Sequence, residues 1–129
     1  MPQYSLLLVD DDEELLELFS RWFSIRGFDV TTAHHPNLAI VSTAYKKFDA
    51  VVIDITLPEM NGIELIDQLK TIGDFPIIVL SGNDSPKLLA AATQRGVCQL
   101  LVKPVAMNVL ETAVRKSIEE STSSVHTSL

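Results

Sequence analysis

Acidic side chains stand at the ends of two apolar segments of this chain, and a serine and a lysine follow two others. Asp10 and Asp11 directly follow the run LLLV, and Asp54 directly follows VVI. Ser81 follows IIVL, and Lys103 follows LLV. Carboxylates are hard oxygen ligands that suit Mg²⁺ or Mn²⁺, a hydroxyl donates a hydrogen bond, and an ammonium carries a fixed positive charge. Together these groups could neutralise the oxygens of a phosphoryl group during its transfer.

Asp54 is the most informative of these residues, because it ends a segment that is expected to be buried. A buried carboxylate without a partner costs free energy, so a cation must compensate it. The loops that follow the apolar runs hold no histidine or cysteine for zinc, and their carboxylates therefore favour Mg²⁺. If Asp10 and Asp11 hold the metal, Asp54 is the carboxylate left to attack phosphorus. Asp12 is expected to cap a helix instead.

The positions of these residues depend on short apolar runs that alternate with stretches of helical periodicity. This alternation is typical of β-α units that build a parallel sheet. We predict a single doubly wound α/β sheet with five parallel strands and five helices. The predicted strands are Ser5 to Val9, Phe28 to Ala33, Ala50 to Ile55, Ile77 to Leu80 and Gln99 to Val102. The predicted helices begin after Asp11 or Asp12 and end at Gly27, then follow as Pro36 to Lys47, Gly62 to Thr71, Pro86 to Gln94, and Met107 to about Glu120.

The apolar patterns also predict where the strands lie in the sheet. LLLV, VVI and IIVL are continuously apolar, which is typical of interior strands covered by helices on both faces. FDVTTA alternates more and suits a position nearer the edge. In doubly wound sheets ligands bind beyond the carboxyl ends of the strands. The polar residues that follow the runs are therefore expected to share one site.

Composition and charge exclude several classes of function. Of the 129 residues, 47% are hydrophobic and 21% are charged, which is close to the average for folded domains, and the length suits one domain. The net charge of −7 argues against direct binding of nucleic acid, which needs a basic surface. No apolar segment has the length of a membrane span or a signal peptide, so a cytoplasmic protein is expected.

Cysteine content and the C-terminal composition give two further expectations. Cys98 is the single cysteine, so the chain can form no internal disulfide, and its apolar surroundings predict a buried, unreactive thiol. The ending SIEESTSSVHTSL loses its apolar periodicity and becomes rich in serine and threonine. Residues 121–129 are therefore expected to be a flexible tail or the beginning of a linker.

Three other residues with functional side chains are assigned to the scaffold. His34 and His35 follow the second predicted strand and are expected to be loop residues at a helix entry. Trp22 lies in the first predicted helix, where it is expected near the acidic site and could serve as a fluorescence probe. None of the three is therefore predicted to be a ligand.

Taken together, LLLVDDD, VVIDITLPEMNGIELI, PIIVLSGND and LLVKP resemble the motifs of bacterial response-regulator receiver domains, in that family's order and with its separations. The match spans about Leu6 to Val114, and its most specific part runs from Asp54 through Pro58 to Gly62. The resemblance implies a flavodoxin-like strand order of 2-1-3-4-5. A receiver domain is then expected over residues 1–120.

The resemblance also implies a role for each site residue. Asp54 is the phosphoacceptor, and Asp10, Asp11, Asp54 and the backbone carbonyl of Thr56 hold Mg²⁺, for which Mn²⁺ can substitute. The implied phosphoryl donor is a phosphohistidine of a sensor histidine kinase or a histidine phosphotransfer protein. Slow self-hydrolysis follows, so the chain is expected to be a regulator rather than an enzyme. Ser81 and Lys103 are the phosphoryl-stabilising residues, and Thr56 and Asn83 tune hydrolysis.

One position departs from the family pattern. Receivers usually carry tyrosine or phenylalanine three residues before the lysine, and this chain has Leu100. The acceptor chemistry needs no ring there, but a leucine cannot report phosphorylation through a moving aromatic side chain. A different or weaker coupling to an effector protein or domain is therefore expected. Phosphorylation-dependent homodimers are common among relatives, and the Lys103–Pro104 bond is commonly cis.

Two alternatives remain open from the sequence. The first is a pseudo-receiver with the same fold, used as an interaction surface without phosphorylation, which the atypical Leu100 keeps open. The second is a haloacid-dehalogenase-type phosphatase, because VDDDE contains D-x-D after a strand, and Ser81 and Lys103 could fill two of its roles. That family also needs a late acidic pair, and here only glutamates of the last predicted helix follow. It would leave Asp54 without a role.

Overall fold

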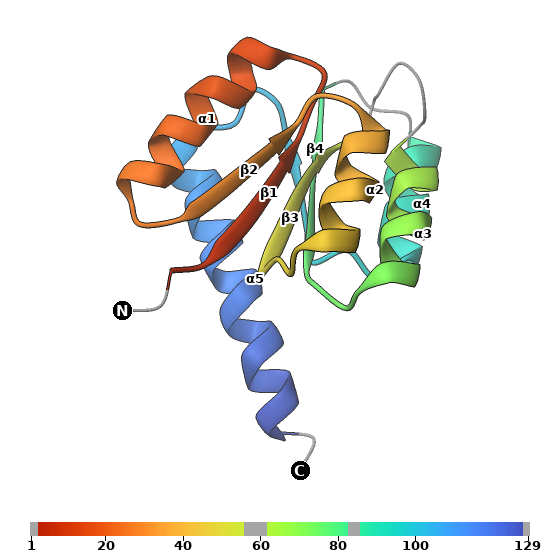
Figure 1. Ribbon diagram of the computed structural model, residues 1–129. Coiled ribbons are helices and arrows are strands. Elements are labelled where there is room, and N and C mark those ends of the chain that lie inside the picture. Colours follow the sequence, from red (N-terminus) through yellow and green to blue (C-terminus); the bar gives the residue numbers. More distant parts are fainter. Residues whose placement is uncertain (1–2, 56–61, 83–85, 128–129) are drawn as a thin grey trace.

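The computed structural model of the 129-residue chain describes residues 3–55, 62–82 and 86–127, with side chains up to residue 122. Five parallel strands form one sheet in the order β2-β1-β3-β4-β5 (Figure 1). The predicted fold class and strand order are confirmed. The strands are β1 (Ser5–Val9), β2 (Asp29–Ala33), β3 (Ala50–Asp54), β4 (Ile77–Ser81) and β5 (Gln99–Val102).

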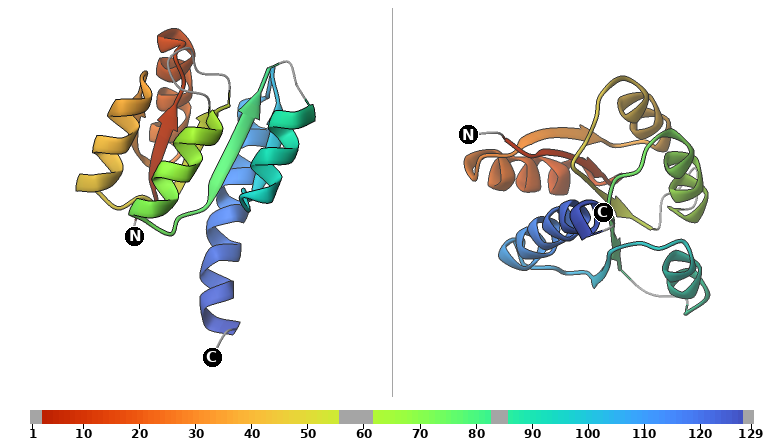
Figure 2. Two further views of the ribbon diagram at one scale, coloured as in Figure 1. Left: turned by 90° about the vertical axis from the view of Figure 1, so that its right-hand side faces the viewer. Right: turned by 90° about the horizontal axis from the view of Figure 1, so that it is seen from below.

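Five helices cover the two faces of the sheet. Helices α1 and α5 pack on one face, and α2, α3 and α4 pack on the other (Figure 2). This arrangement explains the continuous apolar runs, because the side chains on both faces of β1, β3 and β4 are buried. The helices are α1 (Glu13–Ile25), α2 (Pro36–Tyr45), α3 (Gly62–Ile72), α4 (Pro86–Gln94) and α5 (Met107–Thr127).

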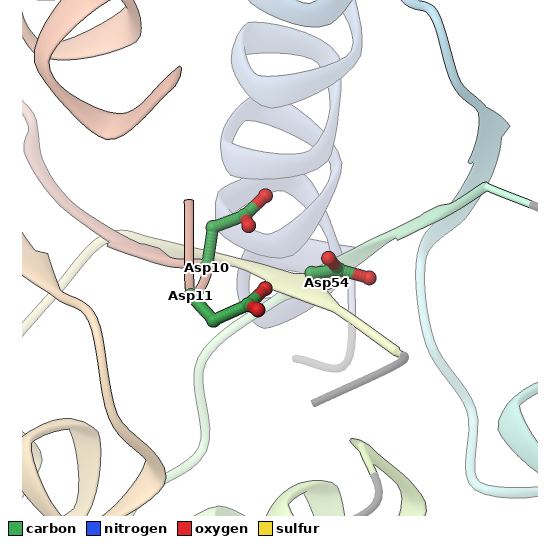
Figure 3. A group of neighbouring side chains, drawn as sticks. All are labelled: Asp10, Asp11 and Asp54. Carbon is green, nitrogen blue, oxygen red and sulfur yellow. The ribbon is translucent and has the colours of Figure 1, made fainter. Parts of the chain in front are cut away.

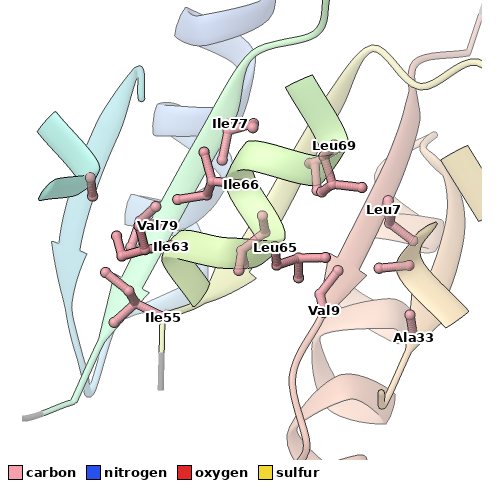
Figure 4. Close-up of a cluster of buried hydrophobic side chains, with 14 of the residues drawn as sticks. Leu7, Val9, Ala33, Ile55, Ile63, Leu65, Ile66, Leu69, Ile77 and Val79 are labelled. Atoms are coloured by element: carbon pink, nitrogen blue, oxygen red, sulfur yellow. The ribbon is translucent and has the colours of Figure 1, made fainter. Parts of the chain in front are cut away.

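Two hydrophobic clusters form the core, one on each face. Leu6 and Leu8 of β1 point into the cluster beneath α1 and α5, whereas Leu7 and Val9 point into the opposite one. Figure 4 shows the second cluster, where α3 lies over β3 and β4. The core fixes the interior strands β1, β3 and β4 on both faces, so their carboxyl ends are held at a common edge.

Local signals set the ends of the first helix as the sequence predicts. The Asp12 carboxylate accepts a hydrogen bond from the Leu15 N–H at 3.1 Å, which makes Asp12 the N-cap of α1. The helix ends before Gly27, whose φ of 93° is a conformation that residues with a Cβ rarely adopt.

The last helix is longer than the sequence predicts. Helix α5 continues to Thr127 instead of ending near Glu120, and its C-terminal part extends beyond the sheet (Figure 2). The apolar periodicity ends where tertiary packing ends, but the backbone hydrogen bonding continues past that point. Among the described residues, no helix has both the length and the apolar character to cross a membrane.

The expectation of a buried Cys98 is wrong, because its thiol is exposed. Cys98, Leu100 and Val102 alternate along the chain and point to the same face of β5, where Leu100 is 36% and Val102 is 63% exposed. Helix α4 packs mainly against α3, so it leaves this face of the edge strand largely uncovered. Gln99 and Leu101, which point to the other face of β5, are half-buried, so this apolar edge strand is less buried than the interior strands.

Candidate functional site

Three carboxylates meet at the carboxyl edge of the sheet. Oxygen atoms of Asp10, Asp11 and Asp54 all lie within 4.8 Å of one another (Figure 3). The strands that position them are neighbours, since Val9 of β1 pairs with Ile53 of β3. Asp10 and Asp11 come next in the chain after Val9, and Asp54 comes next after Ile53. The structure thus brings the three carboxylates together, as the sequence predicts, while their roles in binding a metal and accepting a phosphoryl group stay predictions.

Burial raises the electrostatic cost of bringing these three carboxylates together. Asp10 is 3% and Asp54 is 6% exposed, whereas Asp11 lies at the surface. The Asp10 carboxylate also accepts a hydrogen bond from the Asp12 N–H at 3.0 Å, which orients it toward the cluster. Buried carboxylates this close to one another repel, so the site needs positive charge.

Lys103 supplies part of that charge. Its Nζ lies 2.9 Å from Asp10 Oδ2 and 3.0 Å from Asp54 Oδ2, so one ammonium bridges the two buried carboxylates. Burial lowers the pKa of Lys103, but the hydrogen bonds and charges of the two aspartates outweigh it and raise the pKa above its ordinary value. Lys103 is therefore a fixed positive charge at neutral pH.

The backbone around Lys103 joins the last two strands to the site. The Lys103 N–H donates to the carbonyl oxygen of Ser81 at 2.8 Å, and the Lys103–Pro104 bond is cis, as expected from the sequence. Ser81 is buried at the end of β4, the strand next to β3. Four strand ends thus contribute to one edge. Thr56 and Asn83 lie outside the described residues, so their predicted roles stay predictions.

The residues present fit a hard divalent cation. All three candidate ligands are carboxylates, the donors that Mg²⁺ and Mn²⁺ prefer. Three carboxylates against one ammonium leave two formal negative charges uncompensated, which is the charge of one such ion. Part of the cluster is exposed, so an ion could keep several of its waters.

The remaining sequence assignments have mixed outcomes. His35 caps α2, since its Nδ1 accepts a hydrogen bond from the Asn37 N–H at 3.1 Å, which confirms a role at a helix entry. The expected position of Trp22 near the acidic site is wrong, because α1 begins beside that site at Asp12 and Trp22 lies near the other end of the helix. Its indole N–H donates to Glu111 of α5 at 3.0 Å.

Sequence reasoning missed the ion cluster around Glu111. This buried carboxylate binds Arg26 at the end of α1 and Arg115 of α5, the latter at 2.8 Å. Burial raises the pKa of Glu111, but the hydrogen bonds from Arg115, Arg26 and Trp22 outweigh it and lower the pKa below its usual value. The spacing of Glu111 and Arg115, one helical turn apart, was the available signal.

Comparison with known proteins agrees with this geometry. A family model described as the response regulator receiver domain matches residues 6–115. "Transcriptional regulatory protein GlrR" of Escherichia coli (strain K12) is 34% identical over 117 residues, covering 90% of this chain and 26% of that protein. "Response regulator MprA" of Mycolicibacterium vanbaalenii is 34% identical over 118 residues, covering 91% of this chain and 51% of that protein. The chain thus spans between a quarter and a half of these relatives.

Solved structures have the same fold. A CheY-like receiver domain protein from Methanospirillum hungatei JF-1 superposes with a TM-score of 0.92 at 22% identity, covering 95% of this chain and 99% of that one. The signal receiver domain of an HD domain-containing protein from Pseudomonas fluorescens Pf-5 gives a TM-score of 0.88 at 27% identity, with the same coverage.

The family match decides for a receiver over the haloacid-dehalogenase-type phosphatase considered from the sequence. The strand order, the three clustered aspartates and the bridging lysine agree with it. The chain belongs to the response regulator receiver family.

Proposed function

We propose that this chain is the phosphoacceptor switch of a two-component phosphorelay, and that Asp54 accepts the phosphoryl group. The donor is a phosphohistidine of a sensor histidine kinase or of a histidine phosphotransfer protein. One observation carries the proposal. Asp54 is a buried carboxylate that lies within 4.8 Å of two others and is held by an ammonium at 3.0 Å.

Each charged side chain has a distinct part in the transfer. Asp10, Asp11 and Asp54 would hold Mg²⁺, and Mn²⁺ can substitute; the bound ion supplies positive charge against the phosphoryl oxygens. Asp54 forms a new O–P bond while the N–P bond of the phosphohistidine breaks, and the imidazole nitrogen keeps the electron pair of that bond. Lys103 is already fixed beside the acceptor, so little rearrangement is needed to stabilise the added negative charge.

The residues near the phosphoryl group complete the proposal. Ser81 ends the strand next to that of Asp54 and would donate its hydroxyl to a phosphoryl oxygen. Thr56 and Asn83 would tune the rate of self-hydrolysis, as the family resemblance implies. The domain would act as a regulator whose intrinsic chemistry is limited to its own phosphorylation and dephosphorylation.

The output surface differs from that of most receivers. We expect the signal to leave through α4, β5 and α5, where Leu100 stands on the uncovered face of β5. Without an aromatic ring at this position, coupling should be weaker or different. Binding of a phosphate mimic should shift the NMR signals of α4 and β5 less in the wild type than in Leu100→Tyr. Equal shifts would contradict this.

The remaining partners follow from the same role. We expect an effector protein or domain, no direct contact with nucleic acid or membrane, and a cytoplasmic location. Phosphorylation can also promote homodimers, which light scattering before and after phosphorylation would detect. The large share of the relatives' length outside this match leaves room for effector domains in such proteins.

Intact mass spectrometry tests the proposal. The protein is incubated with acetyl phosphate, with and without Mg²⁺, beside Asp54→Asn. A Mg²⁺-dependent gain of one phosphoryl group in the wild type, absent from Asp54→Asn and labile to base, is expected. No adduct, together with no spectral response to beryllofluoride, would contradict the proposal and favour a pseudo-receiver.

A further inference from the structure

Gly62 begins α3 with no room for a side chain. Its N–H donates to the carbonyl oxygen of Ile55 at 2.8 Å. A Cβ added to Gly62 would lie 2.5 Å from Ile55 Cα and 2.7 Å from the Ile55 carbonyl oxygen, and Cβ atoms essentially never approach other atoms within 3.0 Å. The obstructing atoms belong to the backbone, which cannot turn aside as a flexible side chain can. Any larger residue must therefore displace Ile55.

Ile55 has little freedom to move, because it is held on its other sides. Its N–H donates to the carbonyl oxygen of Leu80 in β4 at 3.0 Å. Its side chain is 1% exposed and packs in the same cluster as Ile63 of α3 (Figure 4). Displacement of Ile55 must therefore pass to its neighbours, and the residue before it in the chain is Asp54.

Glycine is required at this position by close approach and not by backbone conformation. Among the described residues, only Gly27 and Gly96 have positive φ, so the Gly62 backbone would accept alanine. Alanine also has the higher helix propensity. Gly27 is the opposite case, since its φ is 93° and a Cβ there would meet nothing within 4 Å. Alanine at Gly62 therefore tests the effect of a steric clash, whereas alanine at Gly27 tests the effect of an unfavourable backbone conformation.

We propose that Gly62 is a positioning residue that sets the place of Asp54 in the metal and phosphoryl site by fitting against the Ile55 backbone. This inference rests on the proposed function of the acidic cluster. Ordinary contact begins at 3.4 Å, so a Cβ on Gly62 would push Ile55 by about 0.9 Å. Mg²⁺–oxygen bonds are only about 2.0–2.1 Å long and demand near-octahedral geometry. A shift of that size at Asp54 would misplace a ligand.

Direct measurement of metal binding tests this inference. Free Mn²⁺ is followed by electron paramagnetic resonance as it is titrated with wild type, Gly62→Ala or Gly27→Ala. We expect Gly62→Ala to bind Mn²⁺ roughly tenfold or more weakly, the effect of disturbing the support of a metal ligand. Gly27→Ala should lose several degrees in Tm through its positive φ, yet bind Mn²⁺ within about twofold of wild type. Affinity of Gly62→Ala within twofold of wild type would overturn the inference.

A second measurement needs no variant and covers the case in which Gly62→Ala does not fold. If the Gly62 to Ile55 hydrogen bond supports metal binding, metal binding must by linkage stabilise that bond. Saturating Mg²⁺ should slow hydrogen exchange of the Gly62 amide in the wild type, by roughly fivefold or more. Unchanged exchange would overturn the role of Gly62.

The outcomes distinguish this inference from the proposed function. If the wild type binds Mn²⁺ and accepts a phosphoryl group while Gly62→Ala behaves identically, the proposed function stands and the role of Gly62 fails. If the wild type binds no Mn²⁺ at all, the proposed function of the acidic cluster fails, and the role of Gly62 fails with it.

Discussion

The ion cluster around Glu111 predicts that one buried carboxylate outside the acidic cluster contributes strongly to stability. Glu111 Oε1 accepts hydrogen bonds from Trp22 and Arg26, and Oε2 accepts one from Arg115. These contacts join α1 to α5 on one face of the sheet. Glu111→Gln keeps the shape of the side chain but removes its charge and half of its acceptor capacity.

Three hydrogen bonds of Glu111 determine how much stability the substitution removes. The glutamine amide group would face the Arg115 guanidinium, so that charged hydrogen bond is lost, at about 1.5–3 kcal/mol. The two bonds to Oε1 can persist in weaker form, at about 0.5–1 kcal/mol less each. Arg26 and Arg115 are 51% and 39% exposed and can turn to water, which reduces the total. We expect Glu111→Gln to lower the free energy of unfolding by about 2–3 kcal/mol.

Urea denaturation provides the assay, followed by circular dichroism and by the fluorescence of Trp22. Because Trp22 is the single tryptophan and bonds to Glu111, its emission should also differ between the folded variant and the folded wild type. Glu119→Gln is the matched control, because Glu119 is exposed on the same helix and should change stability by less than about 0.5 kcal/mol.

The pH dependence of stability gives a second, independent test of the role of the Glu111 charge. The folded-state pKa of Glu111 lies below its ordinary value of 4.5, so its charge stabilises the fold above pH 4.5. That contribution is lost as the pH falls through the folded-state pKa. The stability difference between wild type and Glu111→Gln should therefore be constant at neutral pH and shrink in acid. A difference under about 0.5 kcal/mol at pH 7, or one that grows in acid, would refute the reasoning.

Three further changes have expected outcomes. Ser117→Ala should leave stability unchanged or raise it by up to about 2 kcal/mol in urea denaturation, because the Ser117 hydroxyl is buried without a hydrogen-bond partner in the described part of the chain. Lys103→Gln should lower the free energy of unfolding in metal-free buffer by about 1–3 kcal/mol, because Asp10 and Asp54 lose their shared cation. Added Mg²⁺ should restore part of the lost stability, which thermal unfolding would detect. Asp11→Asn should slightly raise Tm without metal, because one repelling charge is removed, and should abolish the gain in Tm on adding Mg²⁺.

The fold could be predicted because its strongest signals are local. Continuous apolar runs indicated the interior strands, and the alternation of FDVTTA correctly placed β2 at an edge. The other edge was harder, because the apolar residues of β5 resemble a buried strand. Whether α4 covers that face depends on how α4 packs against α3, and no local pattern reports it. Cys98 was assigned to the interior for this reason.

The candidate site could be predicted as a set of residues but not as a geometry. The rule that strand ends share an edge brought Asp10, Asp11 and Asp54 together. The contacts of Lys103 with both Asp10 and Asp54 could not be predicted from the sequence, because a long, flexible lysine side chain can reach many different partners.

Long-range contacts account for what the sequence did not reveal. Trp22 and Glu111 are 89 positions apart, and neither has a local pattern that names the other. The sequence predicts that Gly62 begins a helix, but the close approach of Gly62 to the Ile55 backbone is seen only in the folded chain.

The central claim is that Asp54 is the phosphoacceptor, and locating the phosphoryl group on the chain tests it most directly. After phosphorylation with acetyl phosphate and Mg²⁺, borohydride reduces an aspartyl phosphate to homoserine, and tandem mass spectrometry of the peptides finds its position. We predict homoserine at position 54 and at no other aspartate. Homoserine at Asp10 or Asp11, or phosphate retained on a hydroxyl side chain with position 54 unmodified, would contradict the account.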